Sequence, residues 1–280
     1  MRLQMPIDLA AGYTSRSQQT RVVSEAWGAE NLYCPNCVSP ALSPAAPNME
    51  AIDFTCPDCE SPFQLKSLSR PFAARIVDAA YRAMRQAIVE DRTPNLVVLH
   101  YDPACWEVKN LVLVPRFVFS LSLLERRKPL GPTARRRGWV GCNILLANVP
   151  PDARIPIVAD GIATSPAWVR QQYARLRPLQ KLGHEARGWT LDVLNVVRAL
   201  LQSRSQESVR ELTDRRQETG GTERAPGEFT LAEVYAFADT LRRLHPQNRH
   251  VEDKIRQQLQ RLRDLGFVEF QGRGVYRLTA

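Results

Sequence analysis

The chain has 280 residues, a length that corresponds to one or two domains and allows a hydrophobic core without disulfide bonds. Hydrophobic residues make up 44% and charged residues 24%, and no apolar run reaches the roughly 20 residues of a membrane helix. Because the N-terminus also lacks the apolar run of a signal peptide, we expect a cytoplasmic protein. The net charge is +9, and only five of the 38 basic residues are lysine. Abundant arginine suits phosphate binding, although a genomic bias would have the same effect.

Four of the six cysteines form two CxxC pairs, which are Cys34 with Cys37 and Cys56 with Cys59. Eighteen residues separate the pairs, which is the spacing of two zinc knuckles. Coincidence and a redox-active CxxC are the alternatives, but two pairs at this spacing favour structural Zn²⁺, and a four-cysteine site leaves no position open for catalysis. We assign Cys105 and Cys142, which stand alone in apolar surroundings, to core packing.

Residues 51–55 and 63–67 predict two short strands joined by a hairpin that carries the second CxxC pair. Because strand side chains alternate, Gln64 and Lys66 share a face, and strand pairing would bring Asp53 beside them. An acid followed after ten residues by (E/Q)-x-K is the arrangement of a metal-dependent phosphodiesterase: Asp53 and Gln64 hold Mg²⁺, and Lys66 orients or deprotonates water. The motif is short, so the spacing alone favours a charged, solvated hairpin.

The rest of the N-terminal part is predicted to be α/β. A helix is expected over residues 72–91, since small and apolar residues recur along one side. Apolar runs predict strands at 95–101, 108–114, 139–146 and 155–158. These elements fit a central sheet with flanking helices.

The segment 126–137 is the most basic part of the chain, and no acid occurs from 126 to 151. Its basic residues are Arg126, Arg127, Lys128, Arg135, Arg136 and Arg137. We interpret them as phosphate contacts, with a solvated basic loop as the alternative. Trp139 follows directly, and its indole can stack on a base or line a pocket for a methyl group, although the sequence alone favours a core position.

The C-terminal part predicts a helix at 189–202, a flexible polar insertion at 203–227, a helix that starts at the capping box of Thr230 and Glu233 and runs to 244, a helix at 250–265, and a hairpin at 267–278. Three helices and a hairpin predict a winged helix, which in principle can bind DNA or protein. The residues expected to contact DNA are Lys254, Arg256, Gln257, Gln260 and Arg261 on the last helix and Arg273 at the hairpin tip.

Long motifs in this order resemble the DpnI family of restriction endonucleases and dam-replacing proteins. They lie at 33–37, 51–59, 63–67, 127–144, 187–190, 254–264 and 272–277, and extend the resemblance over nearly the whole chain. The resemblance implies a PD-(D/E)xK nuclease domain with a zinc site over 1–182 and a winged helix over 183–280. It also implies Mg²⁺-dependent cleavage of double-stranded GATC sites that carry N6-methyladenine, with Trp139 sensing the methyl group.

One position departs from the family, because Gln64 stands where the family has glutamate. A glutamine carbonyl can bind a hard cation but brings no charge, so we expect weaker Mg²⁺ binding. The alternatives are a methylated-DNA-binding protein with a decayed nuclease site, and a zinc-stabilised interaction protein without salt-dependent DNA affinity. We expect a bacterial monomer that acts on DNA, on no membrane and on no small-molecule substrate.

Overall fold

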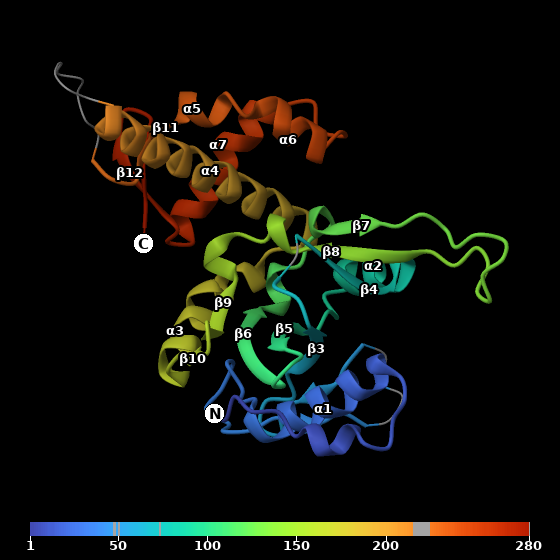
Figure 1. Cartoon of the computed structure of the whole chain (residues 1–280). Helices are drawn as coiled ribbons and strands as arrows, with labels where there is room; N and C mark the ends of the chain where they lie inside the picture. The colour runs from blue at the N-terminus through green and yellow to red at the C-terminus, as the bar shows by residue number, and fades with distance from the viewer. Residues whose placement is uncertain (47–48, 50, 73, 215–224, 280) are drawn as a thin grey trace. The chain divides into compact units, whose positions relative to one another are not determined.

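The computed structural model describes residues 1–46, 49, 51–72, 74–214 and 225–279. The chain forms two compact units, Met1–His184 and Glu185–Ala280, and both combine helices with strands (Figure 1). The prediction of a mixed α/β fold is therefore confirmed. Within the described residues, no helix combines the length and hydrophobicity that crossing a membrane requires.

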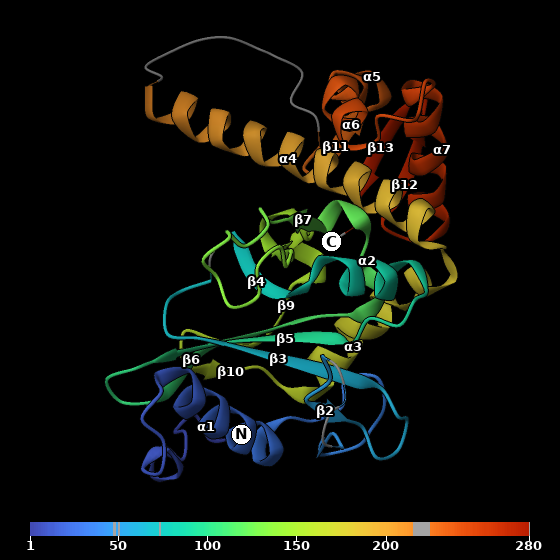
Figure 2. The same cartoon turned by 90° about the vertical axis from the view of Figure 1, so that its right-hand side faces the viewer.

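The first unit is built on a seven-stranded sheet in the order β1-β2-β3-β5-β6-β9-β10. Its strands are β1 (Ser43–Pro44), β2 (Phe54–Thr55), β3 (Pro62–Leu68), β5 (Asn95–Asp102), β6 (Glu107–Val114), β9 (Ile155–Ala159) and β10 (Ile162–Ala163). β3 and β5 run parallel, and β5 buries most of its side chains in the core. Helix α1 (Arg16–Asn31) lies against β3, and α3 (Pro166–Leu176) lies against β9 (Figure 2).

A second sheet in this unit has the order β4-β8-β7. Its elements are β4 (Arg75–Ala80), β7 (Leu124–Arg126) and β8 (Gly141–Leu145), with α2 (Tyr81–Val89) between β4 and β5 in the chain. The prediction of one helix over 72–91 is therefore wrong for its first half. Ile76 and Asp78 are buried while Arg75 and Val77 are exposed, which is the alternation of a strand. Pairing of β4 with β8 outweighs the helix propensity of this alanine-rich segment.

Short 3₁₀ helices connect the larger elements of the first unit. They are η1 (Ile7–Ala10), η2 (Arg116–Val118), η3 (Leu121–Leu123), η4 (Leu146–Asn148), η5 (Pro151–Ala153) and η6 (Arg177–Lys181). The segment between β7 and β8 is different, because it extends away from its sheet as a long loop (Figure 1).

The second unit combines helices with a three-stranded sheet in the order β11-β13-β12. Its elements are α4 (His184–Asp214), β11 (Glu228–Thr230), α5 (Leu231–Tyr235), α6 (Ala238–Leu244), α7 (Val251–Asp264), β12 (Val268–Gly272) and β13 (Val275–Leu278). The capping box is present, since Thr230 and Glu233 exchange side-chain and backbone hydrogen bonds at the start of α5. The helix expected from there to 244 is divided into α5 and α6, and Phe229, Leu241 and Ile255 are fully buried.

The flexible insertion predicted at 203–227 is wrong for residues 203–214, which continue α4. This stretch is polar but contains neither glycine nor proline, so nothing in it interrupts a helix. Ser203 and Ser205 donate hydrogen bonds to the carbonyls of Ala199 and Leu201, one turn earlier, at 2.9 and 3.1 Å. Residues 215–224 of the predicted insertion lie outside the part of the chain that the structure describes, and residues 225–227 lead into β11.

Candidate active site and metal centre

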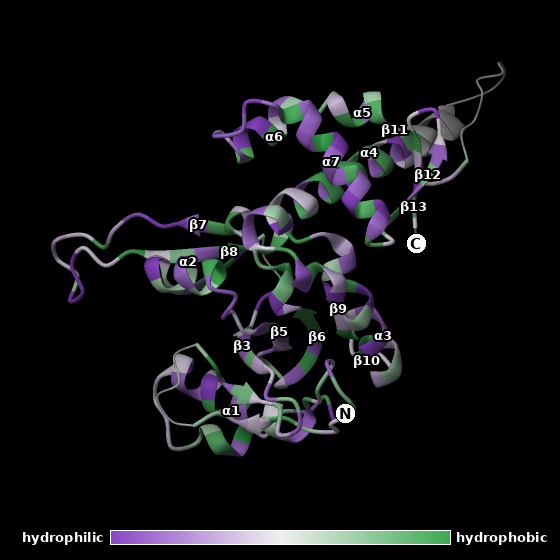
Figure 3. Cartoon of the chain, turned by 180° about the vertical axis from the view of Figure 1, so that it is seen from behind, coloured by the Kyte–Doolittle hydropathy of each residue, from purple (hydrophilic) through white to green (hydrophobic). Residues whose placement is uncertain are grey.

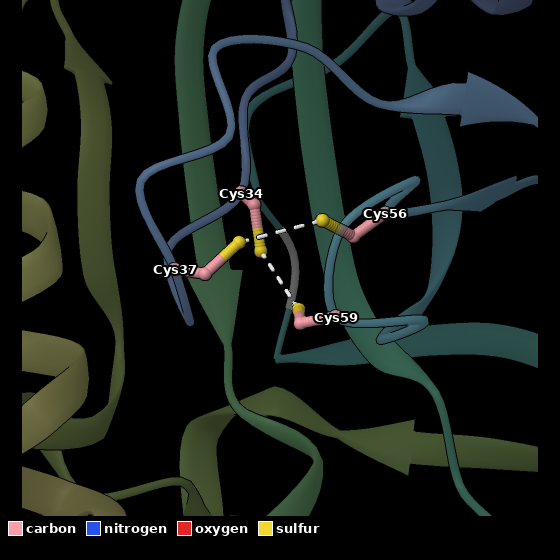
Figure 4. A group of neighbouring side chains, drawn as sticks. All are labelled: Cys34, Cys37, Cys56 and Cys59. Carbon is pink, nitrogen blue, oxygen red and sulfur yellow. Dashed lines mark hydrogen bonds between the residues drawn. The ribbon is translucent and has the colours of Figure 1, made fainter.

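The two CxxC pairs come together in the first unit and point their sulfurs at one another (Figure 4). All four Sγ atoms lie within 4.8 Å of each other, and the closest pairs are Cys34 with Cys59 at 3.6 Å and Cys37 with Cys56 at 3.5 Å. Four sulfurs about 2.3 Å from a tetrahedral Zn²⁺ would be separated by about 3.8 Å. The cluster therefore fits structural zinc without rearrangement.

Two thiols of the cluster differ in their electrostatic environment. Burial raises the pKa of the Cys34 thiol well above its ordinary value. Burial acts in the same direction on Cys59, but hydrogen bonds with Ser61, Asn36 and Cys34 outweigh it and lower the pKa of Cys59 to about 6. Zinc binds thiolates, so loading this site would release protons, above all from the buried Cys34.

Two arginines hold the first knuckle in place, and the sequence analysis missed both. Arg170 on α3 donates from Nε to the carbonyls of Cys34 and Cys37 at 3.1 and 2.8 Å. Arg177 donates to the backbone carbonyl and the side-chain oxygen of Asn36, both at 2.9 Å. Their sequence positions, more than 130 residues from the knuckle, carry no local pattern that would link them to it.

The two remaining cysteines differ from each other. Cys142 on β8 is fully buried and its thiol contacts the carbonyl oxygen of Ala79 at 3.3 Å, in keeping with core packing. Cys105 is exposed, so its assignment to the core is wrong. It lies in the turn between β5 and β6, and its turn neighbours Pro103 and Ala104 are exposed as well, so apolar neighbours in the sequence do not make this a core position.

Asp53, Gln64 and Lys66 converge at the edge of β3. The backbone pairing of β2 with β3 ends at Phe63. Beyond that residue the Asp53 side chain replaces the missing strand partner, because its Oδ2 accepts a hydrogen bond from the Leu65 N–H at 2.7 Å. Gln64 and Lys66 point to the same face of β3, where both contact Asp78 of β4. The alternation predicted for this strand thus holds, and Asp53 lies beside the two residues as expected.

Asp78 is the member of this group that the sequence analysis missed. Its Oδ1 lies 2.6 Å from Lys66 Nζ and accepts a hydrogen bond from Gln64 Nε2 at 3.2 Å. The Asp78 side chain is fully buried, whereas that of Lys66 is 25% exposed. The second carboxylate oxygen, Oδ2, has no hydrogen-bond partner among the described residues. The predicted helix over 72–91 gave no reason to place Asp78 near β3. In the structure, Asp78 belongs to strand β4 and contacts Gln64 and Lys66 of β3.

The charges around Asp53 favour binding of a cation. Burial raises the pKa of its carboxyl, the Leu65 N–H, Lys66 and Arg21 act in the opposite direction, and the Asp78 charge adds to the rise. Glu25 on α1 belongs to the same environment: burial raises its pKa, Arg21 opposes this, and Asp53 adds to it. A bound divalent ion would relieve this excess of negative charge, so the donor set of the Asp53 carboxylate and the Gln64 amide oxygen fits Mg²⁺.

The basic loop between β7 and β8 contains strongly hydrophilic stretches separated by less polar ones (Figure 3). All six predicted cations of the loop are exposed: Arg126, Arg127, Lys128, Arg135, Arg136 and Arg137. Trp139 is half-buried, not a core residue, and the Arg136 guanidinium lies 4.7 Å above its ring. The indole covers Gly141, where a Cβ atom would approach it to 2.7 Å. This glycine thus makes room for the ring.

In the second unit, the predicted DNA contacts lie on α7 and on the turn between β12 and β13. Arg256, Gln257 and Gln260 are exposed, opposite a buried stripe. Lys254 and Arg261 are half-buried. Arg273 is exposed at the tip of the hairpin, with a φ of 50° between two glycines of positive φ. The structure thus presents these groups on a helix surface and a hairpin tip.

Comparison with protein families supports the same division of roles. A model described as the Dam-replacing family matches residues 1–182, and a model described as the Dam-replacing HTH domain matches residues 222–278. The first match contains the zinc cluster and the Asp53 site, and the second contains α7 and the hairpin. The resemblance seen in the motifs is thereby confirmed. The chain belongs to the Dam-replacing family, which implies a nuclease-type protein that binds DNA.

Proposed function

We propose that this protein is a Mg²⁺-dependent restriction endonuclease that cleaves double-stranded DNA at GATC sites carrying N6-methyladenine. Residues 1–182 would form a PD-(D/E)xK nuclease domain and residues 183–280 a winged-helix DNA-binding domain. The observation that carries the proposal is the convergence of Asp53, Gln64 and Lys66 at the edge of β3. Family membership supports a nuclease that depends on DNA methylation.

Each residue of the centre would have its own role in phosphodiester hydrolysis. Asp53 and Gln64 would hold Mg²⁺, which when bound polarises the scissile phosphate. Lys66 would orient the attacking water and stabilise the charge that develops on the phosphate oxygens. Leu65 N–H fixes one Asp53 oxygen, so the carboxylate is already oriented. The zinc cluster would hold the hairpin between β2 and β3 and thus the spacing of Asp53 and Gln64.

Recognition would use both units. The exposed cations of the loop between β7 and β8 would contact phosphates, and Trp139 would sense the adenine methyl group. Its half-buried ring lies between Arg136 and Gly141, and these contacts would orient it to line a pocket. On α7, Arg256, Gln257 and Gln260 would read base edges in the major groove, with Lys254, Arg261 and Arg273 adding backbone contacts.

One observation favours a second function, a DNA-binding protein that does not cleave. Gln64 supplies a neutral amide where the family has glutamate, and a ligand set with one negative charge fewer binds Mg²⁺ more weakly. Such a protein would bind methylated DNA without hydrolysis at any concentration of divalent cation.

Cleavage and mobility-shift assays on methylated plasmid separate the two functions. The proposal predicts Mg²⁺-dependent cutting by the wild type, none by Asp53→Ala, and wild-type activity in the control Asp8→Ala, which removes an exposed acid of η1. Gln64→Glu should lower the Mg²⁺ concentration needed for half-maximal rate. Binding without cutting by the wild type would establish the second function, and unchanged cutting by Asp53→Ala would refute the assigned centre.

A further inference from the structure

Asp78 lies outside the motif that defines the proposed centre, yet it contacts two of its members. We propose that Asp78 is a positioning residue of the nuclease centre, which fixes the amide of Gln64 and the ammonium group of Lys66 through one carboxylate oxygen. This inference rests on the proposed function for its effect on catalysis. The contacts themselves can be tested whether or not the protein cleaves DNA.

The ammonium group of Lys66 is held by this contact. Its Nζ lies 2.6 Å from Asp78 Oδ1, within the range of a charge-assisted hydrogen bond. A lysine side chain has several rotatable bonds, and its charged head otherwise moves toward water. Asp78 comes from β4, in the other sheet of the unit, and is completely buried. The position of the Lys66 ammonium group is therefore tied to a buried residue of the second sheet.

The same oxygen determines how the Gln64 amide is oriented. Gln64 Nε2 donates to Asp78 Oδ1 at 3.2 Å, and a carboxylate oxygen accepts hydrogen bonds but does not donate them. The amide nitrogen must therefore face Asp78, which turns the carbonyl oxygen away from it. That oxygen is the atom through which glutamine can bind a hard cation. Asp78 thus presents the metal-binding atom of Gln64 to the proposed site.

The pairing also gives a physical account of glutamine at position 64. A carboxylate there would lie about as close to Asp78 as the amide does, and two acids at that separation repel each other unless they share a proton or a cation. The amide converts this repulsion into a hydrogen bond. The Asp78 Oδ2 is buried without a hydrogen-bond partner among the described residues, so the contacts with Gln64 and Lys66 through Oδ1 are the ones that satisfy this carboxylate.

The experiment compares Asp78→Ala and Asp78→Asn with a control that removes a similar ion pair elsewhere. Glu107 and Lys109 of β6 also form a pair at 2.6 Å, but both side chains are more than a third exposed, so Glu107→Gln is the matched variant. The chain has only five lysines, and the side-chain amines of lysine-labelled protein can therefore be resolved by NMR. The Lys66 signal is assigned by its loss in Lys66→Met.

Three readouts are compared in the full chain: the lysine spectrum, Mn²⁺ binding without DNA, and steady-state cleavage. In Asp78→Ala, the Lys66 ammonium signal should shift or broaden, Mn²⁺ should bind more weakly, and kcat should fall about tenfold or more with little change in KM for DNA. Asp78→Asn should show smaller decreases in Mn²⁺ affinity and kcat, because its amide oxygen still accepts hydrogen bonds. This variant provides the test if Asp78→Ala does not fold. Glu107→Gln should alter only the Lys109 signal.

A Lys66 signal and Mn²⁺ affinity unchanged in both Asp78 variants would overturn the proposal. The proposal would also be overturned if the decrease in kcat equalled the decrease in the folded fraction measured by thermal unfolding. Failure of the proposed function gives a different result: the wild type would not cleave methylated DNA, while the Lys66 signal would still depend on Asp78.

Discussion

The ion pair between Lys66 and Asp78 leads to a quantitative prediction about stability. Lys66→Met keeps an apolar stem of similar length but leaves the Asp78 carboxylate buried without its cation. Breaking a buried pair by removing one partner costs about 3 to 5 kcal/mol, and the partial exposure of Lys66 places this case near 3 kcal/mol. In a unit of this size each kcal/mol lowers Tm by about 2 to 4 °C, so we expect a decrease of roughly 6 to 12 °C.

The pair of Lys109 and Glu107 is the internal reference for this prediction. Its nitrogen–oxygen distance is the same 2.6 Å, but its side chains are 37% and 36% exposed. Lys109→Met should therefore cost much less than Lys66→Met, because solvent screens an exposed pair. In the double variant Lys66→Met with Asp78→Asn, most of the loss should be recovered, because no buried charge remains.

Urea unfolding followed by tryptophan fluorescence measures these differences, since four of the five tryptophans belong to the first unit and Trp27 is fully buried there. Equal losses in Lys66→Met and Lys109→Met would refute the reasoning that burial, rather than distance, sets the cost. A loss below about 1 kcal/mol in Lys66→Met would refute it as well.

Three further predictions concern the zinc cluster, Asp53 and Trp139. Removing zinc with a chelator should cost on the order of 10 kcal/mol in the first unit, and limited proteolysis should then degrade that unit while the second survives. Cys59→Ser, which removes one of the four thiolate ligands, should destabilise the first unit in the same direction by a smaller amount. The pKa of Asp53 is raised above 3.8 in the folded state, so the free energy of unfolding of the metal-free wild type should decrease as pH rises from 3.8 through the folded-state pKa. Metal-free Asp53→Asn should therefore be more stable than the wild type near neutral pH, and urea titrations should show this difference disappearing toward pH 3.8. A wild type that is more stable than Asp53→Asn near neutral pH would contradict this. Gly141→Ala should displace the Trp139 ring and reduce the preference for methylated over unmethylated DNA with little change in Tm, whereas an unchanged preference would argue against methyl sensing by Trp139.

The sequence was most informative where the chemistry depends on short spacing. The two CxxC pairs predict the sulfur cluster, because four thiols on two tight turns have few other arrangements. The alternation along 63–67 predicts that Gln64 and Lys66 share a face, and β3 bears this out. Both predictions rest on patterns within short stretches of the chain, the CxxC turns in one case and a single strand in the other.

Contacts between distant segments could not be predicted in this way. Asp78 was hidden because small residues at helical spacing around it suggest a helix, and only the pairing of β4 with β8 makes the segment a strand. Arg170 on α3 donates hydrogen bonds to backbone carbonyls of the zinc knuckle. Every residue has such a carbonyl, so the side chains of the knuckle do not indicate this contact. The continuation of α4 through residues 203–214 was missed because polarity was taken as a sign of flexibility.

The central claim is that the protein cuts DNA only where adenine in GATC is methylated. The most direct measurement incubates the full chain and Mg²⁺ with two preparations of one plasmid, methylated and unmethylated at the adenines of its GATC sites. We predict fragments whose ends map to GATC from the methylated preparation and intact plasmid from the other. Equal cutting of both preparations would contradict the proposed specificity, and binding of the methylated plasmid without any cutting would contradict the proposed catalysis.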